Sequence, residues 1–180
     1  MTESTKNVRV ALIGGSGYAG FEAIRRLHRH PRAELVGIYG PAEEVGPITD
    51  FYPLLSKTVE MDQELYDPGR IAGRADVALL CVPHKVAMSY VPDLLAAGVR
   101  VIDWSADYRI KDAAVYEKWY CPHTDADRLA EAVYGLPEYF AEQIDGLTIS
   151  STTSVYDFVA QNDQIQTSML TFLQGARGVE

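Results

Sequence analysis

Basic side chains are scarce in this 180-residue sequence, which carries 16 lysines and arginines against 25 aspartates and glutamates. The formal net charge is −9 and no cluster of basic residues stands out, so neither a nucleic acid nor a membrane is expected as a partner. Cysteine is scarcer still. Only Cys81 and Cys121 are present, too few for a disulfide framework or a cysteine zinc site, and no metal is predicted.

Long hydrophobic runs are also missing. No apolar segment approaches the roughly 20 residues that a membrane-spanning helix needs, and the polar residues 1–7 do not resemble a signal peptide. These absences predict a cytoplasmic protein. Hydrophobic residues nevertheless make up 47% of the chain, which is ample for the packed core of one ordinary domain.

The most informative stretch lies near the N-terminus, where the apolar run Val8–Ile13 leads into four glycines and a helix-forming segment. Strand, glycine turn and helix in this order are typical of a dinucleotide-binding loop. Glycine permits the tight turn and the approach of a pyrophosphate, which the N–H groups of the helix then bind. The alternative is a glycine-rich turn without a ligand. The predicted cofactor-binding residues are Gly14, Gly15, Ser16, Gly17, Tyr18 and Gly20.

Strand-like and helix-like segments alternate along the chain, which predicts an α/β fold with a doubly wound parallel sheet of the Rossmann type. Residues 40–73 are expected to be irregular, with short elements only. The predicted strands are 8–13, 34–39, 75–82, 99–103 and 147–149, and the predicted helices are 20–30, 86–97, 112–119 and 125–132. A turn is predicted at 134–138. Ligands bind beyond the carboxyl ends of such strands, which directs attention to residues 14–17, 82–84 and 103–109.

The end of the second predicted strand bears on the choice of cofactor. An NAD enzyme typically has an acid there for the ribose hydroxyls, whereas this sequence has Tyr39 followed by Gly40 and Pro41, with Glu43 and Glu44 slightly later. The absence of an acid weakly favours NADP, although no arginine stands nearby to bind its 2′-phosphate.

Five segments, in order, resemble the N-terminal part of N-acetyl-gamma-glutamyl-phosphate reductases, over residues 8–149. The segments are Gly14–Gly20 with His30-Pro31, then Val82-Pro83-His84, Val101–Arg109, Tyr116 with Trp119-Tyr120, and Tyr134–Glu138. The resemblance implies NADPH-dependent reduction of N-acetyl-gamma-glutamyl phosphate to its semialdehyde, a step of arginine biosynthesis. In that family a cysteine in an Asn-Pro-Gly-Cys-Tyr loop forms a thioester, and a later histidine supports its thiolate.

The resemblance also assigns roles beyond the glycine loop. Val82, Pro83 and His84 are predicted to lie beside the cofactor, mainly through their backbone. Ser105 and Arg109 are predicted contacts of the substrate phosphate, because a guanidinium binds phosphate in a bidentate manner. The alternative for Arg109 is a structural salt bridge to Asp103 or Asp107. Packing roles are predicted for Trp119, Tyr120, Tyr134 and Leu136.

The sequence departs from the family where the cysteine loop is expected. Residues 150–156 read Ser-Ser-Thr-Thr-Ser-Val-Tyr, without cysteine. Ser154 aligns with the nucleophile but is predicted to be a helix N-cap. We therefore predict residues 1–149 to be a dinucleotide-binding domain, 150–180 to be a divergent helical tail with an apolar face, and the enzyme to be truncated, with no catalytic residue. The tail is predicted to pack on the domain or to contact a second copy in a homo-oligomer.

Neither cysteine restores the missing nucleophile. Cys81 lies inside a predicted buried strand, where cysteine behaves as a small apolar residue. Cys121 has His123 close by in sequence, but this separation does not establish a reactive pair. The alternative to a reductase is therefore a non-catalytic NADP-binding or interaction protein derived from the same domain.

Overall fold

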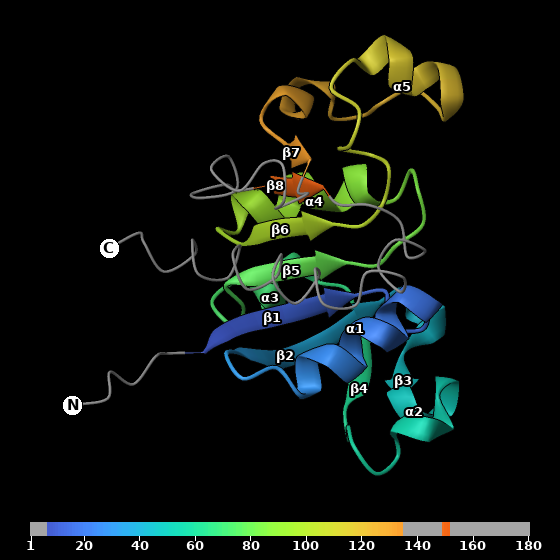
Figure 1. The fold of residues 1–180 in the computed structure, drawn as a ribbon, viewed down its shortest axis with the longest axis vertical. Helices are drawn as coiled ribbons and strands as arrows, with labels where there is room; N and C mark the ends of the chain where they lie inside the picture. The colour runs from blue at the N-terminus through green and yellow to red at the C-terminus, as the bar shows by residue number, and fades with distance from the viewer. Residues whose placement is uncertain (1–6, 135–148, 152–180) are drawn as a thin grey trace, which may run out of the picture.

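The computed structural model describes residues 7–134 and 149–151 (Figure 1). Within them eight strands form one sheet in the order β3-β4-β2-β1-β5-β6-β8-β7, and every neighbouring pair is parallel except β3–β4. The strands are β1 Val8–Ile13, β2 Ala33–Gly40, β3 Gly46–Pro47, β4 Asp62–Leu65, β5 Val77–Leu80, β6 Arg100–Asp103, β7 Val133–Tyr134 and β8 Ile149–Ser151.

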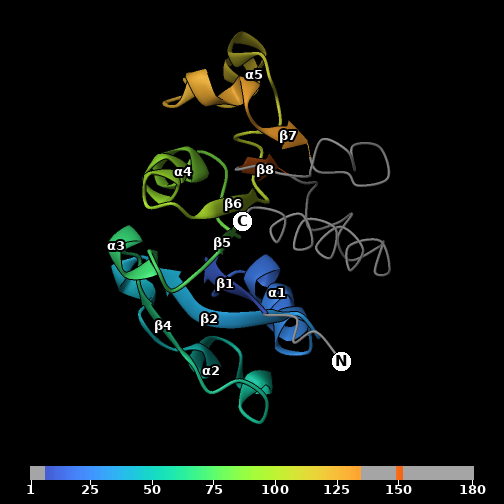
Figure 2. The same cartoon turned by 90° about the vertical axis from the view of Figure 1, so that its left-hand side faces the viewer.

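Helices cover both faces of this sheet. Figure 2 shows α1 on one side and α3 and α4 on the other. The helices are α1 Tyr18–His28, α2 Ile48–Phe51, α3 Pro68–Ile71, α4 Ala87–Ala96 and α5 Ala113–Trp119, with short 3₁₀ helices η1 Ala42–Glu44, η2 Pro53–Leu55 and η3 Ala126–Ala130. The doubly wound, Rossmann-type prediction is confirmed. None of the helices in the described part of the chain has the length and apolar character needed to cross a bilayer.

The side chains of β1 alternate between the two faces of the sheet, so the strand contributes to both hydrophobic cores. Leu12 is fully buried in the core that includes Ile24 of α1, whereas Ile13 is buried in the core that includes Val91 of α4. Burying one such aliphatic side chain stabilises the fold by about 1.5–3 kcal/mol. The two cores hold β1 from both faces and so fix the position of the glycine loop that follows it.

The structure differs from the sequence prediction at several elements. Helix α1 begins at Tyr18, two residues before the predicted start, and the last strand lies at Ile149–Ser151. The polar segment Asp62–Leu65 is a parallel strand next to β2, in a region predicted to be irregular. Leu136, the rest of the predicted turn after Tyr134, Ser154 and the predicted helical tail lie outside the described residues.

Candidate functional site

The carboxyl ends of β1, β5 and β6 meet at one edge of the sheet, as the arrowheads in Figure 1 show. The glycine loop follows β1 directly. Gly14 has a φ of +89°, and a Cβ there would lie 2.5 Å from the carbonyl oxygen of Cys81. The N–H of Gly14 donates to the carbonyl of Tyr39 at 2.8 Å. The loop is therefore tied to the ends of both neighbouring strands.

Two further glycines of the loop are required by packing within the protein. A Cβ on Gly20 would collide with the carbonyl oxygen of Gly14 and the backbone of Gly15. A Cβ on Gly15 would collide with the side chain of Ile38 and lie 2.8 Å from Gln63 Oε1. These contacts let α1 pack closely against the turn, as the sequence predicted.

Gly17 is different, because the protein leaves room beside it. The nearest heavy atoms to a Cβ at this position are 4.0 Å away, which is an ordinary contact distance. Gly17 is also the N-cap of α1, and no side chain caps this helix. The N–H groups of the first turn keep their capacity to bind an anion. Open space beside an uncapped helix start fits the pyrophosphate of a dinucleotide. Tyr18, the first residue of the helix, is 85% exposed.

A polar cluster that the sequence did not predict lies beside this loop. Ser16 Oγ donates to Glu44 Oε2 at 2.6 Å, and Gln63 Nε2 donates to the same oxygen at 3.2 Å and to the Glu44 carbonyl at 3.0 Å. Tyr52 OH donates to the Ser16 carbonyl. Within the described part of the chain, Gln63 Oε1, which is buried beside Gly15, has no hydrogen-bond partner. From the sequence alone, Glu44 could be recognised only as an acid a few residues after the strand that forms β2.

The β5 end lies next to the loop through the Cys81 carbonyl, and it continues into Val82, Pro83 and His84. Val82 is half-buried, whereas Pro83 and His84 are exposed. His84 Nδ1 accepts a hydrogen bond from the N–H of Ala106 at 3.0 Å. This bond leaves the ring proton of a neutral His84 on Nε2 and ties the β5 end to the β6 end.

The β6 end is a buried turn built on two polar side chains. Ser105 donates to Asp103 twice, at 2.8 Å from its N–H and 2.8 Å from its hydroxyl. Burial raises the pKa of Asp103 to about 7. Because Ser105 is itself buried and its hydroxyl is engaged by Asp103, the geometry gives Ser105 a structural role. Its predicted contact with a substrate phosphate stays a prediction.

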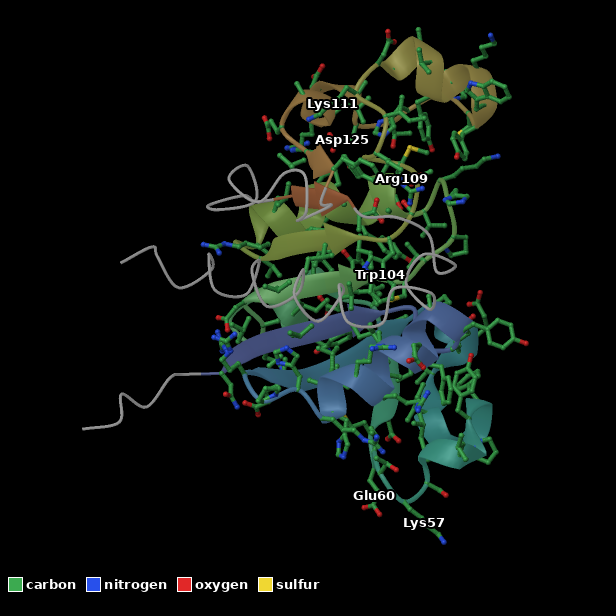
Figure 3. All side chains as sticks on the ribbon, viewed as in Figure 1. Lys57, Glu60, Trp104, Arg109, Lys111 and Asp125 are labelled. Atoms are coloured by element: carbon green, nitrogen blue, oxygen red, sulfur yellow. The ribbon has the colours of Figure 1, made fainter. Side chains whose placement is uncertain are left out.

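Arg109 lies at the same edge, between the labelled Asp125 and Trp104 (Figure 3). Its Nη2 donates to the carbonyl oxygens of Ser105 at 3.0 Å and Trp104 at 3.4 Å. Its guanidinium also lies over the ring of Tyr134, 5.9 Å from the centroid. Within the described residues no ion pair joins Arg109 to Asp103 or Asp107. Where the alternative prediction has a salt bridge, the described contacts of Arg109 are hydrogen bonds to backbone carbonyls and the ring of Tyr134.

Asp107 organises the segment beyond this turn, and sequence reasoning missed it. Its fully buried carboxylate accepts from the N–H groups of Lys85 at 2.8 Å and Met88 at 3.2 Å, and from the hydroxyl of Tyr116 at 2.7 Å. It thereby caps the start of α4, whose own N-cap, Val86, supplies no side-chain bond. A lone aspartate in a loop gave no signal of this long-range contact.

The two cysteines have structural surroundings. Burial raises the pKa of the Cys81 thiol well above its usual value, which suppresses the reactive thiolate. His123 uses both ring nitrogens elsewhere, since Nε2 bonds the carbonyl oxygen of Asp107 at 2.9 Å and Nδ1 accepts from the N–H of Asp125 at 3.1 Å. His123 therefore has no ring nitrogen left to activate Cys121. Among the described residues no group of histidines, cysteines and acids is arranged to bind a metal.

The packing prediction for the aromatic residues is wrong at one position. Trp119 is 72% exposed, because it ends the short helix α5, which buries Tyr116 instead. Tyr120 is half-buried and stacks on Tyr116, with ring centroids 4.8 Å apart. Tyr134 is half-buried under Arg109. The helical spacing of α5 thus assigns the buried face to Tyr116.

Comparison with known families agrees with this geometry. Residues 9–147 match the family described as semialdehyde dehydrogenase, NAD binding domain. The chain belongs to this family. Its glycine loop thus lies in a domain whose family is defined by binding of a nicotinamide dinucleotide, and the family includes oxidoreductases.

Sequence relatives agree with the resemblance predicted above. The chain is 46% identical over 149 residues to N-acetyl-gamma-glutamyl-phosphate reductase of Syntrophobacter fumaroxidans, covering 83% of this chain and 43% of the relative. It is 41% identical over 149 residues to the reductase of Geobacter sulfurreducens, with the same coverage of 83% and 43%. The chain therefore spans less than half the length of these relatives.

Solved structures support the fold. Aspartate semialdehyde dehydrogenase II of Vibrio cholerae, complexed with ASA, superposes with a TM-score of 0.56 at 16% identity, over 82% of this chain and 42% of that one. Aspartate semialdehyde dehydrogenase with NADP from Candida albicans gives a TM-score of 0.55 at 16% identity, with the same coverage of 82% and 42%. At this identity the likeness concerns the fold alone.

Proposed function

We propose that this chain is the dinucleotide-binding domain of an N-acetyl-gamma-glutamyl-phosphate reductase. The observation that carries the proposal is Gly17, the loop glycine for which the protein itself provides room. Packing and backbone conformation account for Gly14, Gly15 and Gly20, whereas a ligand accounts for Gly17. The sequence relatives named above support the choice of reductase.

Each part of the loop has a role in holding the cofactor. The space beside Gly17 admits the pyrophosphate, and the N–H groups at the uncapped start of α1 bind its oxygens. Gln63 Oε1, buried beside Gly15 without a partner in the described structure, provides a polar group beside the loop. A bound nicotinamide dinucleotide supplies hydride chemistry. Val82, Pro83 and His84 border the site from the β5 end.

The substrate proposal rests on the resemblance rather than on the site. It comprises reduction of N-acetyl-gamma-glutamyl phosphate, a small-molecule acyl phosphate, with NADPH as the reductant that the family implies. Arg109 is the proposed phosphate contact, since its guanidinium lies at the same edge of the sheet as the glycine loop. We also propose that this chain by itself does not turn over, because the surroundings of Cys81 and Cys121 do not activate a thiol.

A titration of the purified 180-residue chain tests cofactor binding. Following the fluorescence of NADH and of NADPH, we expect saturable binding of at least one of them. Gly17→Ala adds a methyl group where the pyrophosphate is proposed to bind, so binding should fall roughly tenfold or more, while the melting temperature stays within a few degrees. Equal affinity in wild type and Gly17→Ala would contradict the proposed site.

Activity of the chain alone is a separate test. Phosphate-dependent oxidation of N-acetylglutamate semialdehyde is the reverse of the proposed reaction and is followed at the nicotinamide absorbance. We expect no rate above that of a heat-treated sample. A clear rate that disappears in Cys121→Ser would contradict the non-catalytic assignment of this chain and identify Cys121 as the nucleophile.

A further inference from the structure

The surroundings of the loop beyond β2 are acidic. Residues 33–56 contain Glu34, Glu43, Glu44 and Asp50 but no lysine or arginine. The first cation after them, Lys57, is labelled at the lowest tip of the molecule in Figure 3, away from β1 and α1. Arg70 and Arg74, whose charges reach Tyr39 at the end of β2, are paired with Glu64. A 2′-phosphate bound at this turn would therefore meet the carboxylates of Glu43 and Glu44.

Glu44 is the acid that reaches the glycine loop. The 3₁₀ turn η1 starts two residues after β2 and carries Glu44 back to Ser16, which stands between Gly15 and Gly17. The sequence-based preference for NADP rested on the lack of an acid at the end of β2. The turn removes that basis, because it brings a carboxylate to the same edge from a few residues farther along the chain.

In place of the NADPH that the resemblance implies, we propose that Glu44 makes this site selective for NAD(H) over NADP(H), by accepting a hydrogen bond from the adenosine ribose and repelling a 2′-phosphate. This inference rests on the proposed function, since it concerns the specificity of the same cofactor site. Like charges placed together at a binding site oppose association strongly, while a carboxylate and a ribose hydroxyl form a charge-assisted hydrogen bond.

The hydrogen bonds of the cluster leave Glu44 able to act in this way. Both side-chain bonds to its carboxylate fall on Oε2; within the described structure Oε1 keeps its lone pairs for a ribose hydroxyl. Gln63 holds the carboxylate in place, and its amide orientation is fixed because Nε2 faces two acceptors of Glu44. Its Oε1 is then fully buried beside Gly15 without a partner. A buried acceptor of this kind is a further sign of a binding site for hydroxyl groups.

The negative field extends across the site to α4. Burial raises the pKa of the Tyr90 phenol, and Glu43 and Glu44 raise it further. Tyr90 in turn stacks on Tyr66, which follows β4, with ring centroids 4.1 Å apart. Both acids of η1 therefore influence the side of the site formed by β4 and α4.

The test compares the affinities of the full chain for NADH and NADPH by fluorescence titration at low ionic strength. We expect NADH to bind roughly tenfold or more tightly than NADPH. Glu44→Gln retains the size and one acceptor oxygen but removes the charge, so the preference should fall to within about threefold of parity. Glu43→Gln is the matched control, since it removes one charge from the same short helix without a bond to the loop, and it should keep most of the preference.

A second readout depends on screening. Adding salt to 0.5 M should strengthen NADPH binding relative to NADH in wild type, because repulsion between exposed charges is screened at high ionic strength. Glu44→Gln should show a smaller change. Tighter binding of NADPH than of NADH by the wild-type chain, or an unchanged preference in a folded Glu44→Gln variant, would overturn the inference and leave the proposed function intact. Binding of neither cofactor would overturn both.

Discussion

Gly17 and Gly20 belong to one loop but need to be glycine for different reasons. A Cβ on Gly20 would collide with backbone atoms of Gly14 and Gly15, which cannot move without displacing α1. The heavy atoms nearest to a Cβ on Gly17 would lie 4.0 Å away from it. Identical substitutions at the two positions therefore separate the stability of the fold from the binding of a ligand.

We expect Gly20→Ala to lower the free energy of unfolding by about 3 kcal/mol or more, because overpacking against backbone forces the helix away from the sheet. Gly17→Ala should change it by less than about 1 kcal/mol. Urea denaturation followed by circular dichroism measures both values. Similar losses of stability in the two variants would show that the room at Gly17 is not available to a methyl group.

Asp103 is expected to make the stability of the protein fall as the pH rises. Burial raises its folded-state pKa from 3.8 to about 7, so the folded state holds a proton that the unfolded state releases between these values. Well below pH 3.8 the carboxyl is protonated in both states, and well above pH 7 the folded state bears the full penalty of a buried charge, roughly 4 kcal/mol. Urea denaturation at several pH values measures this dependence.

Asp103→Asn cannot titrate and should remove this decline between pH 4 and 7, with a gain in stability at pH 8. Its amide oxygen still accepts from Ser105 N–H, so the turn is retained. Asp127→Asn changes an exposed carboxylate of η3 and is the control, for which the dependence should match the wild type. A wild-type stability that rises steadily from pH 4 to 7, with the same rise in Asp103→Asn, would rule out this assignment.

At the scale of elements, α4 depends on a distant residue for its start. Asp107 binds the N–H groups of Lys85 and Met88 and the hydroxyl of Tyr116, all from within the protein. Helix α5, in contrast, has its own N-cap, Asp112, which accepts from the N–H groups of Ala114 and Val115. One helix is capped locally, and the other is capped through the tertiary structure.

We expect Asp107→Ala to reduce the free energy of unfolding by about 3 kcal/mol or more, because it leaves two buried donors and one part-buried donor without an acceptor. Asp112→Ala should cost only about 1 kcal/mol, the usual value of an exposed cap. Asp107→Asn retains one acceptor oxygen and should fall between the two. The measurement is the urea midpoint of each variant, and equal losses for Asp107→Ala and Asp112→Ala would contradict the long-range cap.

Sequence patterns predicted the elements that bury apolar residues. Val8–Ile13 and Val77–Leu80 are recognisable as strands because β-branched and aliphatic residues follow one another. Asp62–Leu65 was missed because a polar side chain, Gln63, occupies its buried position and is paired with Glu44. The same pairing kept Glu44 out of the predicted site, since a contact between η1 and β4 leaves no local pattern.

At the scale of the whole molecule, cofactor binding should raise the resistance of the folded state to heat. A ligand present at about 100 times its dissociation constant stabilises the folded protein by roughly 2.7 kcal/mol. For a chain of this size we expect a rise in melting temperature of about 5–10 °C. Differential scanning fluorimetry with NADH measures it. A tenfold loss of affinity in Gly17→Ala should reduce the rise at the same NADH concentration to roughly half or less. A comparable rise in that variant would place the bound ligand elsewhere.

The order of the strands has a further consequence for how the chain is synthesised. Strand β8, the last described in sequence, lies between β6 and β7 and is parallel to both. The protein emerges from the ribosome with its N-terminus first. One edge of β6 therefore stays unpaired until residues 149–151 are available, and Val133–Tyr134 has no strand to pair with until then. An exposed strand edge in a nascent chain invites mispairing with other chains. Strand β8 thus joins β7 to the strands that precede it in the chain.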